Sequence, residues 1–296
     1  MNPIIEPDLS TFAFAPSGPD DAYYDYCLEP YRPRRPFKHK FRSENLFWHA
    51  LMCAGLHASL EPALRAVQRS LGPDLTVWGV KWDGQRLWAE IYIYDPQRED
   101  AATTLEGLSE TLRPFIQVKA RAPASASYVM VSFDLDHTVA ESKVIPEANL
   151  YLTGENAHAG RSYIASEHDL ELANTYRFFQ AKAESDSVLK LIKASTFMDF
   201  SGRNTLAKVV PPELFGCKKI CVAKKRRADA IYFSGVAVDQ LRWFLKRFEY
   251  PSPLLELVSK YEARFEHLYF DVGIDYLWDH QAQQLRYLKT SYYGTF

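Results

Sequence analysis

The chain has 296 residues, of which 47% are hydrophobic and 24% are charged, and its formal net charge is −2. This composition is ordinary for a globular protein, the small net charge gives no reason to expect binding to nucleic acid or an anionic membrane, and no apolar run approaches the roughly 20 residues of a membrane span. Four cysteines without C-x-x-C spacing, and a first segment unlike a signal peptide, predict reduced thiols in the cytoplasm.

The beginning of the chain differs from the rest. Residues 1–41 are rich in Pro, Asp and Tyr, and we expect them to cross the surface without regular structure. Residues 42–296 are expected to form a single domain, since their length suffices for one large core. A helical pattern runs from Ser43 to Leu71, and the Ser43-Glu44 pair is typical of a helix start.

Five antiparallel hairpins are predicted after this helical region. The first covers 75–94 and turns at Asp83-Gly84, which is a strong signal for a two-residue hairpin loop. The others are expected within 128–154, 196–210, 217–235 and 267–296. Helices are expected at about 101–116, 168–193 and 238–266. The sequence therefore predicts about ten strands, separated mostly by helices.

The predicted strands have one apolar face and one polar, aromatic face, because successive strand side chains point to opposite sides. In 86–94 the apolar face consists of Leu, Ala and Ile, and the opposite face carries Trp88, Glu90 and Tyr92. Helices around a closed barrel would bury the apolar faces and leave no exposed edge. We therefore predict an α+β fold, a ten-stranded antiparallel β-barrel surrounded by α-helices, with a lumen able to hold a ligand. An open α+β sheet is the alternative.

The final hairpin carries an unusual strand face. The last strand groups Tyr287, Lys289, Ser291 and Tyr293 on one side. Tyrosines around a single lysine are typical neither of an ordinary wet surface nor of an apolar core. This face fits the wall of a site that holds an anionic group next to an apolar one.

The succession of hairpins and helices resembles the ABBA-type prenyltransferases, and within them most closely the cyanobactin peptide prenyltransferase family. The local similarity lies in DLDHTVAES (134–142), SGRNTLAKVVPPEL (201–214), AIYFSG (230–235) with QLRWFL (240–245), and LKTSYYGTF (288–296). The hairpin VKWDGQRLWAEIYIY (80–94) matches more loosely. The order and spacing of these motifs, from about residue 75 to the end, carry the resemblance.

The resemblance implies an enzyme that transfers a dimethylallyl (C5) or geranyl (C10) group from its diphosphate, through an allylic carbocation, to a side chain of a ribosomal peptide. It also implies Mg²⁺ as a cofactor, a peptide and a prenyl diphosphate as partners, and a monomer. Two alternatives stay open. The same fold could act on a free small aromatic such as an indole or phenol, or the chain could be an inactive relative.

Candidate donor-binding residues follow from that chemistry. Ionising an allylic diphosphate requires fixed cations around the leaving oxygens. The candidate diphosphate-binding residues are Lys143, Lys208, Lys219, Lys289, Tyr232 and Tyr293. The resemblance places a diphosphate-binding lysine at Lys143 and a basic residue of the last strand at Lys289. Aromatic faces stabilise the allylic cation and keep water away, and the candidates for this shield are Trp88, Tyr92 and Tyr232.

Carboxylates on the predicted lumen face are candidates for work on the acceptor. Glu90 is the candidate base, because removing the acceptor's proton needs a positioned carboxylate. The glutamate usual on the family's first strand is not apparent near Thr76–Trp78, and Trp78 is assigned to acceptor binding. Asp134 and Asp136 are assigned there too, and an acidic pocket would suit an arginine or histidine acceptor. No metal ligand is assigned.

Overall fold

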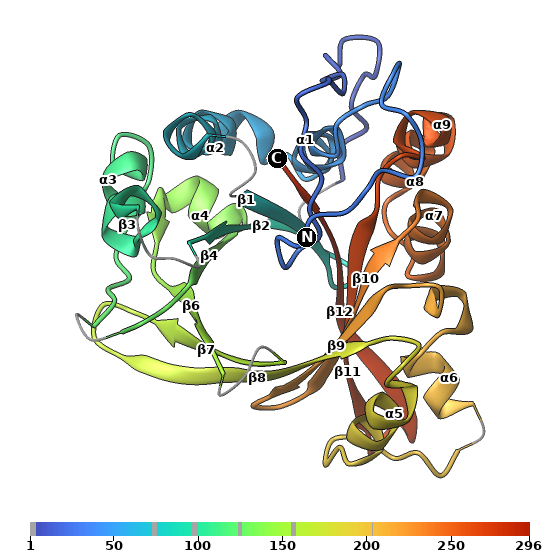
Figure 1. The fold of residues 1–296 in the computed structure, drawn as a ribbon. Coiled ribbons are helices and arrows are strands. Elements are labelled where there is room, and N and C mark those ends of the chain that lie inside the picture. Colours follow the sequence, from blue (N-terminus) through green and yellow to red (C-terminus); the bar gives the residue numbers. More distant parts are fainter. Residues whose placement is uncertain (1–3, 73–75, 96–99, 124–125, 155–157, 203) are drawn as a thin grey trace.

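The computed structural model describes residues 4–72, 76–95, 100–123, 126–154, 158–202 and 204–296. Ten strands form a closed antiparallel barrel in which neighbours follow chain order, and β1 pairs with β12 to complete the circle (Figure 1). These strands are β1 (Thr76–Trp82), β2 (Leu87–Tyr94), β4 (Met130–Leu135), β6 (Ala148–Thr153), β7 (Ala159–Ala165), β8 (Leu170–Gln180), β9 (Lys219–Lys225), β10 (Asp229–Val236), β11 (Phe270–Asp279) and β12 (Gln284–Thr295). The predicted α+β fold with a ten-stranded barrel is therefore confirmed.

Helices lie on the outside of the barrel (Figure 1). The described residues form α1 (Glu44–Cys53), α2 (His57–Leu71), α3 (Leu105–Leu112), α4 (His137–Ser142), α5 (Ser185–Lys193), α6 (Thr205–Val209), α7 (Val238–Arg247), α8 (Ser252–Lys260) and α9 (Glu262–Phe265). Two short 3-10 helices, η1 (Ala101–Thr103) and η2 (Pro212–Leu214), and a small parallel pair, β3 (Gln117–Val118) with β5 (Val144–Ile145), complete the elements. None of the described helices combines the length and apolarity needed to cross a membrane.

The hydrophobic core lies between the barrel and its helices. Outward-facing strand residues such as Ile91 and Phe133 are fully buried there. Trp78 of β1 packs against Phe47 of α1, with ring centroids 5.7 Å apart. Because the apolar faces point outward to the helices, the polar and aromatic faces of the same strands line the lumen.

One predicted hairpin is wrong. The described residues of 196–210 contain no strand, and part of them forms α6. In the region predicted as a helix at 168–193, β8 occupies residues 170–180 and only α5, at 185–193, is helical. The hairpin of β7 and β8 has an irregular register between Ser162 and Tyr163. Leu170 and Leu172 of β8 also remain 39% and 45% exposed. A strand with exposed apolar side chains lacks a clear alternation of apolar and polar residues. For this reason the sequence pattern did not predict β8 as a strand.

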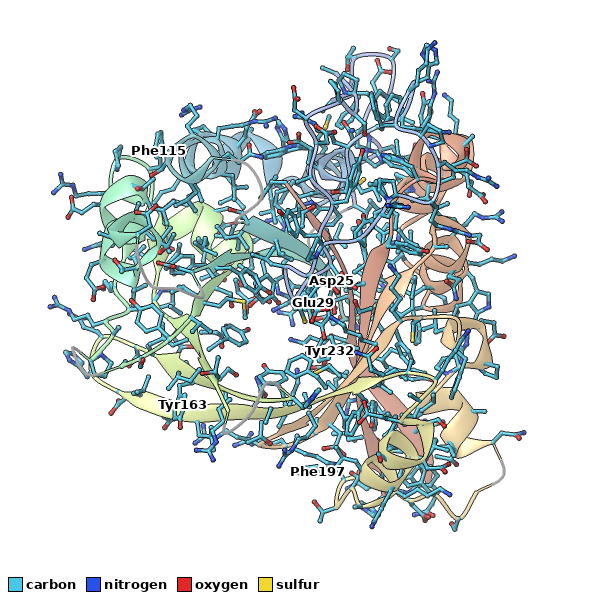
Figure 2. All side chains as sticks on the ribbon, in the orientation of Figure 1. Asp25, Glu29, Phe115, Tyr163, Phe197 and Tyr232 are labelled. Carbon is cyan, nitrogen blue, oxygen red and sulfur yellow. The ribbon has the colours of Figure 1, made fainter. Side chains whose placement is uncertain are left out.

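The N-terminal segment reaches further than expected. Its described part, residues 4–41, forms no helix or strand and contributes only isolated bridges, Pro16 with Phe41 and Tyr24 with Pro30. Some of its side chains pack on the outside of the hydrophobic core, which agrees with the expected path across the surface. The stretch Asp25–Glu29, however, reaches the lumen, and Figure 2 shows Asp25 and Glu29 at its edge.

Candidate active site

A cavity of about 670 Å³ opens at the end of the barrel where β1 begins and β2 ends. Its volume is in the range of ligand-binding pockets. In Figure 2, Tyr232 lies at the lumen wall, whereas Tyr163 lies on the outer side of the barrel. The aromatic and large apolar side chains that line the cavity include Tyr92, Tyr94, Met130, Tyr151, Leu152, Tyr176, Phe178, Tyr232 and Tyr293.

Five tyrosines form a chain of rings across the lumen, which we call the tyrosine belt: Tyr176, Tyr151, Tyr92, Tyr293 and Tyr232. Their successive ring centroids are 6.1, 6.1, 5.9 and 6.2 Å apart. Burial raises the pKa of each phenol, so all five stay neutral near pH 7. Neutral aromatic faces in contact with a cavity can stabilise a carbocation and exclude water.

Two glycines leave room for rings of the belt. A Cβ atom on Gly79 of β1 would lie 2.7 Å from the Tyr293 ring, and one on Gly273 of β11 would lie 2.6 Å from the Tyr232 ring. Both distances are shorter than any normal contact. Glycine at these positions therefore lets the two phenols lie flat against the neighbouring strands.

Next to the belt lies a charged layer of three lysines and three carboxylates, which are Lys81, Lys225, Lys289, Glu90, Asp134 and Asp275. Along β12, Tyr293 and Lys289 face the lumen four residues apart, so the charged layer lies on the side of the belt opposite the cavity. Lys81 bridges Glu90 and Asp134, with 2.7 Å between Nζ and Asp134 Oδ1. The formal charges in this layer cancel.

Lys81 and Asp134 hold each other charged. Burial opposes ionisation of both groups, but the carboxylates of Asp134 and Glu90 raise the pKa of Lys81 above its usual value. Likewise, burial raises the pKa of Asp134, but the positive charges of Lys81 and Lys289 lower it below its usual range. The resulting pair is a fixed part of the lumen wall.

Lys289 is held more loosely. Its nearest carboxylate is Asp275, with Nζ and Oδ2 3.8 Å apart, while Lys225 contacts the same oxygen at 2.6 Å. Burial, followed by the positive charge of Lys81, lowers the pKa of Lys289 to about 8. The Lys289 side chain is still 29% exposed, although it does not line the cavity. Lys289 is therefore the lysine of this layer best placed to receive an added anion.

Glu90 connects the belt to the charged layer. Its carboxylate accepts hydrogen bonds from the hydroxyl groups of Tyr92 and Ser132 and pairs with Lys81. The residue is 2% exposed. The side-chain amide of Asn149 also donates to it at 3.5 Å. Glu90 is thus a buried carboxylate with four partners, and one of them, Tyr92, faces the cavity.

A second charged group surrounds the mouth of the cavity. Lys219 of β9 contacts Asp25 at 3.4 Å and also pairs with Glu29. The buried Asp271 accepts hydrogen bonds from the backbone N–H groups of Tyr26 and Gly235, at 2.9 and 3.1 Å. Burial, and then the charge of Asp25, raise the pKa of Asp271 to about 7. The mouth is therefore held together by polar contacts between the barrel and the N-terminal segment.

Most of the predicted site residues do meet in the lumen. Glu90, Asp134 and Lys289 lie in the charged layer, and Tyr92, Tyr232 and Tyr293 belong to the belt. Lys219 lines the cavity mouth, where two carboxylates of the chain neutralise it. Trp88 lies on the charged-layer side rather than beside the cavity, because its indole N–H donates to Asp134 at 3.0 Å.

Four predictions of lumen-facing residues are wrong. Lys143 follows α4 outside the barrel and donates to the carbonyl of Ser59 at 3.0 Å. Lys208 belongs to α6, since its predicted strand does not exist. Trp78 faces outward into the core, so it cannot bind an acceptor in the lumen. Asp136 lies beyond β4 and caps α4, accepting a hydrogen bond from the Val139 N–H at 2.9 Å.

Several lumen residues were not predicted from the sequence. Lys81 alternates with Gly79 on the inner face of β1, and Lys225 alternates with Cys221 on β9, so strand parity could have placed both. Tyr151 lies in a strand predicted only within 128–154, and Tyr176 lies in a region predicted as a helix. No sequence signal indicated that Tyr26 of the irregular segment would contact the belt.

The described lumen carboxylates do not fit a magnesium ion held by the protein. Glu90 and Asp134 are bridged by Lys81, and Asp275 is paired with Lys225. Among the residues that the structure describes, no group of three or more His, Cys, Asp or Glu side chains is arranged to bind a metal. Mg²⁺ stays an expectation from the resemblance, and no step below uses it.

The chain matches no protein-family model, and a search of curated proteins found no relative. The resemblance to the ABBA-type prenyltransferases therefore rests on the motifs quoted above and on the ten-stranded barrel.

Proposed function

We propose that the protein is a prenyltransferase that moves a dimethylallyl or geranyl group from its diphosphate to a side chain of a ribosomal, cyanobactin-type peptide. One observation carries the proposal: a belt of neutral tyrosines separates an open cavity from a layer of lysines inside a closed barrel. Allylic transfer needs both environments next to each other, since an anion and a carbocation form in the same step.

In the proposed reaction, the bond between C1 of the prenyl group and the diphosphate oxygen breaks, and both electrons stay on the oxygen. Lys289, with Lys225 beside it, stabilises the negative charge that develops on the diphosphate. A diphosphate adds negative charge to a layer whose own charges cancel, and it thereby raises the pKa of Lys289 back toward its usual value.

The tyrosine belt stabilises the allylic cation. Tyr232 and Tyr293 come from strands β10 and β12, and the rings of Tyr92 and Tyr293 meet edge to face at 5.9 Å. Each ring that faces the cation contributes about 0.5–2 kcal/mol. Rings packed around the cation also exclude water from it, so that the acceptor is the nucleophile within reach.

The acceptor enters through the cavity and completes the reaction. Its lone pair forms the new bond to C1, and its proton passes to Glu90, which already accepts a hydrogen bond from Tyr92. Because the three carboxylates of the charged layer are balanced by its three lysines, the lumen gives no preference for an arginine or histidine acceptor. A cavity of about 670 Å³ accommodates a C5 or a C10 group.

The test is direct transfer. The purified protein is incubated with dimethylallyl or geranyl diphosphate and a panel of linear and cyclic peptides, and separately with free indoles and phenols. A gain of one C5 or C10 unit on a peptide, read by mass spectrometry, supports the proposal. Transfer to free aromatics alone would assign the protein to that chemistry. Diphosphate binding without transfer to any acceptor would contradict the enzymatic function.

A further inference from the structure

The stretch Tyr24–Pro30, which we call the mouth loop, is a self-contained peptide turn. Its ends meet in the bridge between Tyr24 and Pro30. The Asp25 carboxylate accepts hydrogen bonds from the backbone N–H groups of Cys27 and Glu29, at 2.9 and 3.0 Å, and the Leu28 N–H donates to the Asp25 carbonyl at 2.9 Å. The turn is therefore held by hydrogen bonds among its own residues, independently of its contacts with the barrel.

The barrel binds this turn with groups that recognise peptide backbone. Asp271 accepts a hydrogen bond from the Tyr26 N–H at 2.9 Å, and the hydroxyl of Tyr94 donates to the Tyr26 carbonyl. The Tyr26 ring stacks against Tyr232 and Tyr293, with centroid distances of 6.3 and 6.1 Å. A backbone amide, a backbone carbonyl and an aromatic ring are thus each matched by a group of the lumen wall.

The acidic side chains of the turn are matched as well. Lys219 contacts both Asp25 and Glu29, and the hydroxyl of Ser234 approaches Asp25 at 3.5 Å. These contacts are a charge pair and hydrogen bonds to groups that any acidic peptide would offer. The mouth therefore has the features of a binding site for an aromatic residue flanked by acidic residues, and the chain's own loop occupies it.

The mouth loop can leave without unfolding the domain. None of its residues belongs to the hydrophobic core or to the side chains packed on it, whereas Tyr23 before it and Phe41 after it do. The Glu29 side chain is 62% exposed. Polar contacts of this kind exchange readily with water or with equivalent groups of another peptide.

We propose that the mouth loop is a built-in occupant of the acceptor site, and that a peptide with an aromatic residue next to acidic residues binds by displacing it. This inference rests on the proposed function, in which the acceptor is a peptide. It goes further by naming the groups that recognise the peptide and by making the free protein self-inhibited. Asp271 and Tyr94 bind the acceptor backbone, Lys219 binds its carboxylates, and the belt receives its ring.

The experiment measures peptide binding to the full-length protein. The probe is a fluorescent synthetic peptide that copies residues 22–31, with Cys27→Ser to prevent oxidation. In the double variant Asp25→Asn, Glu29→Gln, the loop loses its charge contacts with Lys219 while keeping its size. We expect this variant to bind the probe about tenfold more tightly than the wild type, because the mouth loop occupies the acceptor site in a smaller fraction of the molecules. Adding Lys219→Met should remove the gain.

A matched control is Glu110→Gln, which removes an exposed carboxylate paired with Arg113 on α3, away from the mouth. This variant should bind the probe as the wild type does. Equal or weaker binding by the double variant, or no binding at all, would overturn the inference, since the loop would then be a permanent part of the wall.

A second measurement follows the loop itself. Cys27 is half-buried and lines the cavity, as does the buried Cys221, and displacement of the loop should make Cys27 more accessible to an alkylating reagent. We expect saturating probe peptide to accelerate alkylation of Cys27, read site by site by mass spectrometry. An unchanged rate at saturation would contradict displacement. Peptide transfer without loop displacement would refute only this inference, whereas displacement without transfer would refute only the prenyltransferase function.

Discussion

Replacing Lys289 by methionine should separate stability from ligand binding. In the folded protein burial lowers the pKa of Lys289 from 10.5 to about 8, so the charged side chain costs up to about 3 kcal/mol below pH 8. Because this side chain is 29% exposed, water screens part of the cost, and we expect about 1 kcal/mol. Lys289→Met should therefore raise the melting temperature at pH 7 by about 2–4 °C.

The same substitution should weaken diphosphate binding. A hydrogen bond between a charged lysine and a diphosphate oxygen contributes about 1.5–3 kcal/mol. Loss of this contact corresponds to a rise in Kd of roughly 10- to 150-fold. Calorimetric titration with inorganic diphosphate and with dimethylallyl diphosphate measures the change, and thermal unfolding at pH 7 and pH 10 measures the stability. The gain in stability should shrink between pH 8 and 10.5, since the folded wild type releases its proton there while the unfolded chain keeps it.

Lys143→Met is the matched control, because Lys143 lies outside the barrel although the resemblance placed a diphosphate ligand there. It should leave both Kd and melting temperature within error of the wild type. If Lys143→Met abolished diphosphate binding and Lys289→Met did not, the assignment of the charged layer to the diphosphate would be refuted.

Three further outcomes follow from the same geometry. Above pH 8 diphosphate affinity should fall, and calorimetry at pH 8.5 in buffers of different ionisation enthalpy should show proton uptake by the wild type but not by Lys289→Met. Glu90→Gln should abolish transfer in the mass-shift assay while leaving diphosphate binding intact, because Lys81 keeps its contact with Asp134 at 2.7 Å. Gly79→Ala should lower the free energy of unfolding in urea by about 1–3 kcal/mol, because its Cβ would lie 2.7 Å from the Tyr293 ring.

Each of these has a result that contradicts it. A diphosphate affinity that stays constant from pH 7 to 9 would mean that Lys289 does not contact the ligand. Unchanged turnover of Glu90→Gln would remove Glu90 from the mechanism. For Gly79→Ala, the cost should largely disappear in combination with Tyr293→Leu, and an additive double mutant would show that the ring is not the cause.

The fold and the site could be predicted from the sequence where turn signals and the alternation of buried and lumen-facing residues agree. The hairpin of β1 and β2 was predicted because Asp83-Gly84 marks the turn and because β2 is backed by the core on one side only. Strand parity then placed Glu90 and Tyr92 in the lumen. On β12 the same rule placed Lys289 in the lumen from the sequence of its own strand alone.

Strand parity failed beyond the ends of strands and in a strand whose apolar side chains are exposed. β4 ends at Leu135, so parity no longer applies to Asp136, which caps a helix instead. Leu170 of β8 is exposed rather than packed in the core, and the sequence pattern predicted a helix in place of its strand. The contact of Tyr26 with the belt depends on a turn that residues about 200 positions away hold in place, and no local pattern reports such a contact.

The exposed outer side of β7 and β8 has a mechanical consequence. Strand β8 contacts α5, as β1 contacts α1 and β11 contacts α7, but its Leu170 and Leu172 remain 39% and 45% exposed. The same two strands supply Gly160, Tyr176 and Phe178 to the cavity wall. Segments with few buried apolar contacts deform at the lowest cost. Leu170 and Leu172, however, lie at the start of β8, at the end of the barrel away from the mouth. We therefore expect the β7–β8 hairpin to deform most easily at that end, and hydrogen exchange to be faster there than at the cavity wall.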